Sequence, residues 1–341
     1  FFDLCDGKAL EAPWAAPDYA AVALQLAEKT GDIHLVNLAK GVAVHSVIGR
    51  TQWRTAAKLL AEYRQDAVDC CAVCAGDWLR RQGDLLTEAH DPVLAAGFLD
   101  LSAEILGKNL GDDMRGRILF VRSIAHFFAR NPVQALRDAD EALRSYALST
   151  PRGYFMDTIA LFGCFLKDRA ERQHYQAALD SLTDFRQRIK GQSKGWHEVR
   201  DRLRWVIAQI DAWLGHSRRA RVALERTRAS HRKHSPHRYA LAIALDETLV
   251  YCMHRNLPHV HVRSIQGILK SCKQNLKLED DLKRKLRHAA RQLGESPWHA
   301  RQILVGLRRS FIVPVPSLLA SNRPPAESAR KRKAAATLAG P

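Results

Sequence analysis

The residues best suited to chemistry lie in the segment DCCAVCAGDW, which holds Cys70, Cys71 and Cys74. On one continuous helix Cys70 and Cys74 would lie one above the other, and the two-residue gap from Cys71 to Cys74 is typical of half a zinc site. A tetrahedral zinc site needs four ligands, yet the sequence has neither a second Cys-x-x-Cys pair nor a His-x-x-x-His pair. We therefore interpret the three cysteines as small thiols packed between helices, and we expect no metal and no cofactor.

Histidines form two further groups in the C-terminal half of the sequence. They are His231, His234 and His237, followed by His254, His259 and His261. The first group spans an expected helix end and a loop broken by Pro236, so its spacing does not place three imidazoles on one face. We expect exposed loop histidines or contacts with a polyanion there, rather than metal ligands.

The sequence lacks the usual signatures of catalysis. It has no glycine-rich phosphate-binding loop, no His-Glu-x-x-His pair and no recognisable nucleophile with its base. The paired acids at 112–113 and 280–281 stand at expected helix starts, where carboxylates favour the positive end of the helix dipole. The sequence therefore predicts a protein that is not an enzyme.

A recurring helical unit positions these residues. In the segment LRWVIAQIDAWLGHSRRARVALERTRAS, an apolar helical face ends at Gly215, and a second helix with small inward residues follows. Similar second helices are entered through Ala135, Ala177 and Ala220, at intervals of 42 and 43 residues. A nearly constant interval of this length is typical of a helical solenoid.

Composition supports the same architecture. The chain has 46% hydrophobic and 26% charged residues, and its β-branched residues form no alternating runs. No apolar run reaches the roughly 20 residues that cross a bilayer. The odd number of cysteines, seven, lacks paired spacing and favours reduced thiols. We expect a cytoplasmic chain with no membrane segment.

The predicted fold class is all-α, in the form of a right-handed α-solenoid of antiparallel helix pairs. We expect an irregular lead-in over 1–16, the helical array over 17–295, and a C-terminal extension over 296–341 that is basic and disordered from about 320. Near the cysteines we expect one helix over about Ile33 to Ile48. A second, long helix should open at Thr51, continue to Gln82 and close at Gly83.

The repeat resembles the tetratricopeptide repeat, and in particular the C-terminal repeats of a bacterial group of such proteins. The matching residues are Leu203, Arg204, Trp205, Leu214, Gly215, Ala220, Tyr239, Leu245, Asp246 and Tyr251. The resemblance covers about residues 90–293, with Arg130 and Arg255 standing where a turn glycine is typical. It implies a helical repeat fold and a role as an interaction scaffold or as a sensor and regulatory module.

For such a scaffold, the concave face made by the first helix of each pair would bind a protein or peptide partner. Helix phase places these candidate partner-binding residues there: Arg122, His126, Arg204, Gln209 and Asp211.

The distribution of charge leaves an alternative. The net charge is +17, and residues 1–110 hold 10 Lys and Arg against 15 Asp and Glu, whereas the rest holds 43 against 21. The basic half predicts an acidic partner or a nucleic acid, unless it is simply a solvated surface. The candidate polyanion-binding residues are Arg218, Arg219, Arg221, Arg228, Arg232 and Lys233. Trp205 and Trp213 are better explained by packing than by base stacking.

Overall fold

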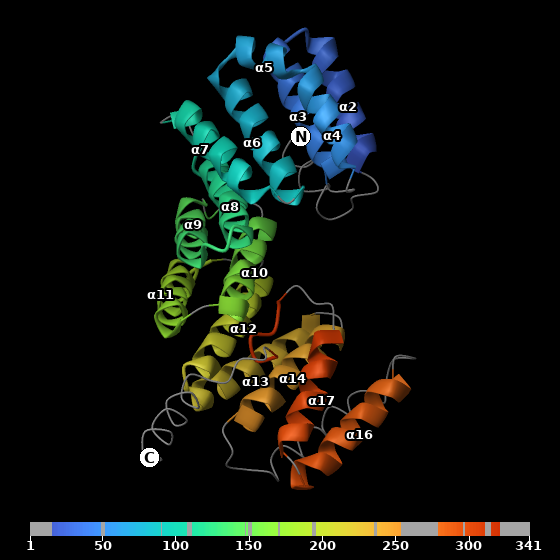
Figure 1. The fold of residues 1–341 in the computed structure, drawn as a ribbon, viewed down its shortest axis with the longest axis vertical. Coiled ribbons are helices and arrows are strands. Elements are labelled where there is room, and N and C mark those ends of the chain that lie inside the picture. Colours follow the sequence, from blue (N-terminus) through green and yellow to red (C-terminus); the bar gives the residue numbers. More distant parts are fainter. Residues whose placement is uncertain are drawn as a thin grey trace, which may run out of the picture. The chain divides into compact units, whose positions relative to one another are not determined.

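Helices make up all the regular secondary structure in the described part of the chain, and this confirms the predicted all-α class there (Figure 1). The computed structural model describes residues 16–48, 52–89, 91–107, 111–146, 148, 152–169, 171–192, 196–234, 237–253, 279–295, 297–310 and 315–320. The chain divides into two compact parts, which we call unit 1 (Phe1–Tyr154) and unit 2 (Phe155–Pro341). None of the helices within these ranges is both long and apolar enough to span a bilayer.

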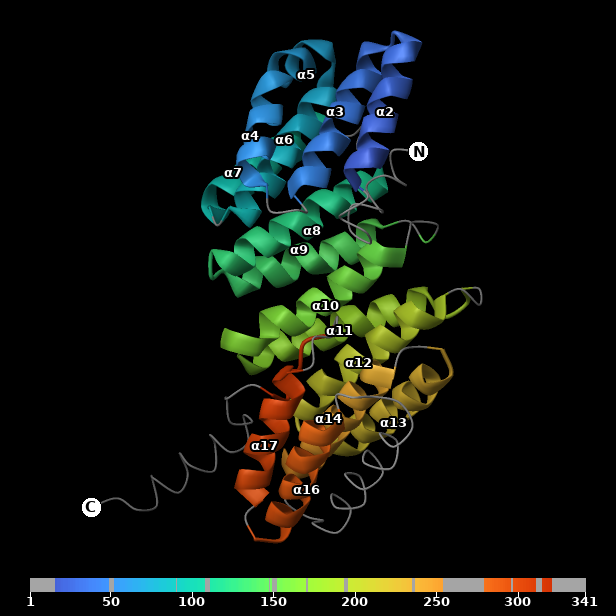
Figure 2. The ribbon, with the colours of Figure 1, turned by 90° about the vertical axis from the view of Figure 1, so that its right-hand side faces the viewer.

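Unit 1 consists of helices that pack mainly on their neighbours in sequence. Its helices are α2 (Ala16–Thr30), α3 (Ile33–Ile48), α4 (Trp53–Glu62), α5 (Arg64–Cys70), α6 (Ala72–Glu88), α7 (Pro92–Leu106), α8 (Asp112–Phe128) and α9 (Pro132–Ser145). Asp91 and Asn131 cap α7 and α9 by accepting hydrogen bonds from backbone N–H groups, and a proline follows each cap. Proline fits there because the first helical N–H has no partner inside the helix. Figure 2 shows α6 beside α3 and α4.

The prediction of one long helix from Thr51 to Gln82 is wrong. The segment forms α4, α5 and α6, with breaks at Tyr63 and Cys71. Cys71 has an extended backbone, with φ of −171° and ψ of 166°, and its thiol accepts a hydrogen bond from the Cys74 N–H at the start of α6. Gly83 does not close a helix but lies inside α6, where a Cβ would come within 2.6 Å of Leu99 Cγ. The glycine therefore lets α7 pack closely on α6.

A buried network of charges lies at the junction of α3 and α6. Arg80 donates to Asp77 at 2.8 Å and to Asp84 at 3.1 Å, and all three side chains are buried. Burial alone would raise the pKa of Asp84, but Arg80 and His45 outweigh it and lower that pKa. Gly41 lets α3 pack closely on α6, since a Cβ at position 41 would lie 2.5 Å from Asp77 Oδ2. Each buried charge in this network thus has a counter-charge inside unit 1.

Unit 2 begins within α10 and is also helical. Its helices are α10 (Arg152–Arg169), α11 (Arg172–Arg188), α12 (His197–Trp213), α13 (Ser217–His234), α14 (His237–Met253), α16 (Glu279–Glu295) and α17 (Pro297–Ser310). Helix α17 packs on α14 and α16 (Figure 2). The helical part therefore continues beyond residue 295, where the sequence placed the end of the array.

Asp246 on α14 is the polar centre of unit 2. This fully buried carboxylate accepts hydrogen bonds from Trp205 Nε1 at 2.8 Å, from Ser317 Oγ at 2.6 Å and from the Arg308 guanidinium at 3.0 and 3.1 Å. It thereby joins α12, α14, α17 and the segment 315–320. Because Arg308 is 2% exposed, its charge depends on this carboxylate. Most of the tail predicted to be disordered, residues 321–341, lies outside the described residues.

Candidate functional site

A pocket with a volume of about 340 Å³ opens among α11, α12 and α13 of unit 2. Its position follows from helical spacing, since Arg218, Val222 and Arg226 lie at intervals of four on one face of α13. Five arginines line the pocket: Arg186, Arg204, Arg218, Arg219 and Arg226. The remaining lining residues are Asp211, Ile207, Val222 and Ala223.

The charges of the pocket are only partly balanced from within. Arg204 donates to Asp201 at 2.8 Å, and Asp211 lies 3.6 Å from Arg219 and 3.1 Å from His216 Nδ1. The other three arginines are exposed, and no acidic side chain of the described residues pairs with them. They are Arg186, Arg218 and Arg226. These three cations are therefore available to an anionic ligand.

The pocket also has an apolar strip. Ile207 is buried at its base, Ala223 is half-buried, and Val222 is 37% exposed. A ligand that covers Val222 removes apolar area from water, and this area stabilises the complex in addition to any charge pairing. Arginine guanidinium groups beside an apolar strip suit a chain that carries both carboxylates and aliphatic side chains.

The pocket brings together residues from both sets of sequence candidates. Arg204 and Asp211 come from the predicted partner-binding set, and Arg218 and Arg219 come from the predicted polyanion-binding set. Arg186 was not predicted, because it lies on the preceding helix, α11, and no spacing within α12 or α13 points to it.

Gln209 lies away from this pocket. Its side chain is fully buried, and its amide oxygen accepts a hydrogen bond from the Leu318 N–H at 2.6 Å. Its amide nitrogen is 3.4 Å from Asp246 Oδ2. The structure thus places Gln209 in the core of unit 2, with no surface to offer to a partner.

Arg122 and His126 lie in unit 1 and share Asp138. Arg122 donates to both oxygens of Asp138, at 2.8 and 2.9 Å, and to Asp100 at 2.6 Å. Burial alone would lower the pKa of Arg122, but the two carboxylates raise it. His126 Nε2 lies 3.6 Å from Asp138. The charge of Arg122 is therefore balanced inside unit 1.

The remaining polyanion candidates do not line the pocket. The Arg221 guanidinium lies 5.3 Å above the ring of Tyr251, and Arg228 pairs with Glu247 at 3.2 Å. The side chains of Arg232 and Lys233 lie outside the described residues.

The expectation of exposed loop histidines is wrong for His231. This residue lies in α13, is 8% exposed and contacts the rings of Trp205 and Tyr239 edge to face. Burial lowers the pKa of its imidazole. The other histidines of the two groups lie outside the described residues: the side chains of His234 and His237, and the whole of His254, His259 and His261.

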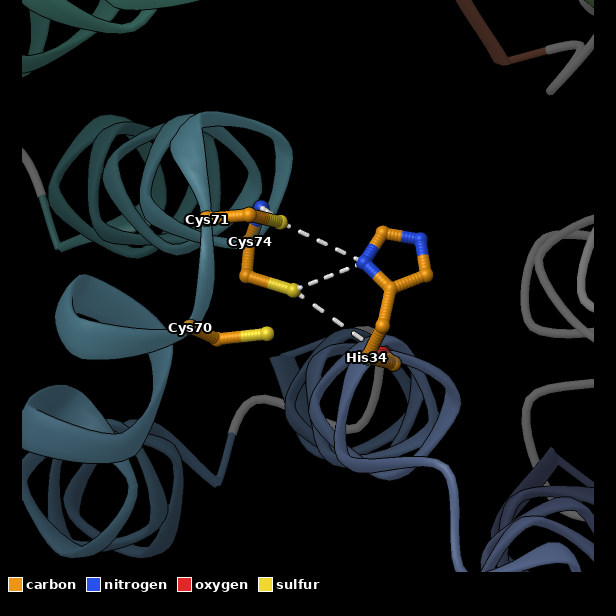
Figure 3. Close-up of side chains that lie close together, drawn as sticks. All are labelled: His34, Cys70, Cys71 and Cys74. Atoms are coloured by element: carbon orange, nitrogen blue, oxygen red, sulfur yellow. Dashed lines mark hydrogen bonds between the residues drawn. The ribbon is translucent and has the colours of Figure 1, made fainter.

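A second group of functional side chains lies in unit 1, where His34 joins the three cysteines (Figure 3). His34 Nδ1 is 3.3 Å from Cys71 Sγ and 3.2 Å from Cys74 Sγ. One ligand atom from each of the four side chains lies within 4.8 Å of the others. The sequence offered no signal for His34, since it precedes Cys70 by 36 positions and stands in a different helix.

The break between α5 and α6 creates this arrangement. Cys70 ends α5, Cys71 is extended, and Cys74 lies in the first turn of α6, while His34 lies in the first turn of α3. Burial alone would raise the pKa of Cys71, but hydrogen bonds with the Cys74 N–H and with His34 lower it to about 7. Burial and the two neighbouring thiols raise the pKa of Cys74.

No model of a known protein family matches the chain, and a comparison with curated proteins likewise finds no match. The resemblance to tetratricopeptide repeats therefore depends on the residues of this chain alone, and its function has to be argued from its own geometry.

Proposed function

We propose that this chain is a cytoplasmic, non-enzymatic interaction scaffold of tetratricopeptide type, in which the pocket of unit 2 binds an acidic segment of a partner protein. The observation that carries the proposal is the set of three exposed arginines beside the apolar strip that pair with no acidic side chain of the described residues. A solvated basic surface would not need an apolar strip among its cations.

Two turns support the repeat architecture. Arg130 and Gly215 each follow a first helix by two residues, and both have a positive φ, of 62° and 95°. Each turn has the same hydrogen bond, which runs from Asn131 N to His126 O in one and from His216 N to Asp211 O in the other. The turns are 85 residues apart, which is the sum of the two repeat intervals. A left-handed arginine costs roughly 1–2 kcal/mol, and its use at a turn that matches the one at Gly215 supports the proposed repeat.

The burial of Trp205 and Trp213 and the exposure of Val222 favour a peptide over a nucleic acid as the ligand. Proteins that bind single-stranded nucleic acids rely on aromatic side chains that stack on the bases. Trp205 and Trp213 are only 2% and 6% exposed, so neither offers a face to a base. Val222 adds an apolar contact that a phosphate backbone cannot use, whereas an aliphatic side chain between carboxylates can.

The test uses the full chain and three fluorescein-labelled probes: a peptide of Asp-Glu-Leu repeats, a peptide of Lys-Arg-Leu repeats, and a single-stranded DNA oligonucleotide. We expect the acidic peptide to bind best in an anisotropy titration, with weaker binding at higher salt. The double variant Arg218→Glu/Arg226→Glu should lower its affinity by about tenfold or more.

The matched control is Arg287→Glu/Arg291→Glu, which makes the same change of charge at two exposed positions of α16. This variant should keep the affinity for the acidic peptide. Val222→Ser distinguishes the two ligand classes, because it should lower the affinity for the acidic peptide severalfold and leave the affinity for DNA unchanged. Tighter binding of the oligonucleotide, with no effect of Val222→Ser, would overturn the peptide proposal in favour of a nucleic acid.

A further inference from the structure

We propose that His34, Cys70, Cys71 and Cys74 bind one zinc ion in unit 1, as a Cys3His site that links α3 to the junction of α5 and α6. This site is separate from the arginine-lined pocket, and its test does not depend on the function proposed for that pocket.

The four side chains lie close enough together to surround one zinc ion. Zinc–sulfur bonds of about 2.3 Å and zinc–nitrogen bonds of about 2.0 Å give sulfur–sulfur edges of about 3.8 Å and sulfur–nitrogen edges of about 3.6 Å. His34 Nδ1 lies 3.3 and 3.2 Å from two of the sulfurs, and no pair of ligand atoms is more than 4.8 Å apart. An ion at the centre requires the two His34–sulfur edges to lengthen by about 0.3–0.4 Å, and any pair near the 4.8 Å limit to close by about 1 Å.

Three directions of approach converge on this centre. Figure 3 shows the His34 imidazole facing the thiols of Cys71 and Cys74 from α3, while Cys70 reaches the same space from the end of α5. A single helix would spread Cys70, Cys71 and Cys74 along one side. The extended backbone of Cys71 turns the two consecutive thiols, Cys70 and Cys71, toward one space.

The donor set selects the kind of metal. Thiolates and imidazole favour zinc over the hard ions magnesium and calcium, which prefer oxygen ligands. Four protein ligands fill a tetrahedral shell and leave no position for water, so the geometry suits a structural site and not a catalytic one. His34, Cys70 and Cys71 are half-buried and only Cys74 is buried, which leaves a path for the ion from solvent.

Zinc binding would also link two segments of unit 1 and add to its stability. The hydrated ion exchanges its water for three thiolates and a neutral imidazole, and the three thiol protons pass to the buffer. The bond formed by His34 then ties the start of α3 to the break between α5 and α6, which lies 37 residues later at Cys71. Because the ion binds only when these segments meet, its binding free energy adds to the stability of unit 1.

The direct test is the zinc content of the full chain, purified without chelator and measured by plasma mass spectrometry. We expect about one zinc per chain for the wild type and almost none for Cys71→Ser/Cys74→Ser. The matched control is Cys164→Ala/Cys252→Ala, which removes two described cysteines outside the site that form no disulfide, and it should keep the zinc. Zinc retained equally by both double variants would overturn the site, as would its absence from the wild type after zinc is supplied.

A second measurement does not depend on variants that fold. Anaerobic titration of the metal-free wild type with Co²⁺ should give thiolate charge-transfer bands, together with intense visible bands that mark tetrahedral coordination. His34→Ala should change the visible bands and weaken Co²⁺ binding by about tenfold or more, in line with the loss of one ligand. Weak bands of an octahedral ion, or a Cys71–Cys74 disulfide that forms while zinc is present, would contradict the assignment.

Discussion

The cysteine site of unit 1 and the arginine pocket of unit 2 use reactive side chains in opposite ways. In unit 1, four ligand atoms from α3, α5, α6 and the break at Cys71 lie within 4.8 Å of one another. In unit 2, three exposed arginines line an open pocket without carboxylate partners among the described side chains. The first arrangement suits a cation bound within unit 1, whereas the second suits an anionic surface supplied by a partner. The converging ligand atoms therefore favour a structural role in unit 1, and the arginines without described counter-charges favour a partner-binding role in unit 2.

The same contrast separates arginines within unit 2. Arg308 is 2% exposed and bound by the Asp246 carboxylate, while Arg218 is exposed at the pocket. A buried cation depends strongly on its counter-ion, and an exposed one does not. Stability measurements should therefore divide the arginines into structural and functional groups.

The largest expected effect follows from the removal of the buried carboxylate. Asp246→Ala leaves the Arg308 guanidinium buried without its counter-charge and should lower the free energy of unfolding by about 3–5 kcal/mol. Urea denaturation followed by tryptophan fluorescence measures the loss. Asp180→Ala, at an exposed carboxylate of α11, is the control and should cost less than about 1 kcal/mol. Equal losses for the two variants would show that Asp246 is not the polar centre of unit 2.

Removal of the metal should affect unit 1 alone. At a free zinc concentration about 100 times the dissociation constant, the ion contributes about 2.7 kcal/mol, and a chelator removes this stabilisation. Hydrogen exchange of amides in α3, α5 and α6 should then accelerate by up to about 100-fold, while α12 and α13 keep their protection. Uniform acceleration in both units, or none in α3, would break the contrast between the two sites.

The pH dependence of unit 2 should reflect His231. Because burial lowers the pKa of His231 in the folded state below its ordinary value of 6.5, the unfolded chain takes up a proton first as the pH falls. Stability is thus fully present above pH 6.5 and decreases as the pH falls toward the folded-state pKa. The neighbouring Asp201 and Glu198 oppose the shift, whereas Arg202 and His197 add to it.

Urea denaturation between pH 7.5 and pH 5 checks this direction. His231→Phe keeps an aromatic ring between Trp205 and Tyr239 and should remove most of the decrease in stability. A wild type and a variant with the same pH profile would mean that another group controls the acid side of the stability curve.

The smallest effect on stability is expected at the pocket. Arg218→Glu/Arg226→Glu changes exposed side chains without described partners and should alter the free energy of unfolding by no more than about 0.5 kcal/mol per site. Urea denaturation measures this value. A loss of several kcal/mol would assign these arginines to the structural group, with Arg308.

Local patterns in the sequence predicted the features that depend on short spacing. The helix over Ile33 to Ile48 and the proline start of α9 follow from periodicity and from the residues that begin helices. Helix phase selected Arg204 and Asp211, and the clustering of positive charge selected Arg218 and Arg219; all four line one pocket.

Local spacing in the sequence could not predict contacts between residues that lie far apart along the chain. His34 meets Cys71 across 37 positions, and Gln209 is buried because the Leu318 N–H reaches it across 109 positions. No periodicity encodes either meeting. The break at Cys71 was missed for a related reason, since its residues have acceptable helix propensity and only tertiary contacts decide that the helix stops.

If the exposed arginines of the unit 2 pocket select an acidic partner segment, reversing their charge should reverse the choice of ligand. Anisotropy titrations compare the Asp-Glu-Leu and Lys-Arg-Leu peptides against the wild type and against Arg218→Glu/Arg226→Glu. We predict that the wild type prefers the acidic peptide and that the variant reverses the preference. If both proteins show the same preference, the pocket does not select its ligand by charge, and the proposed binding of an acidic segment by unit 2 is wrong.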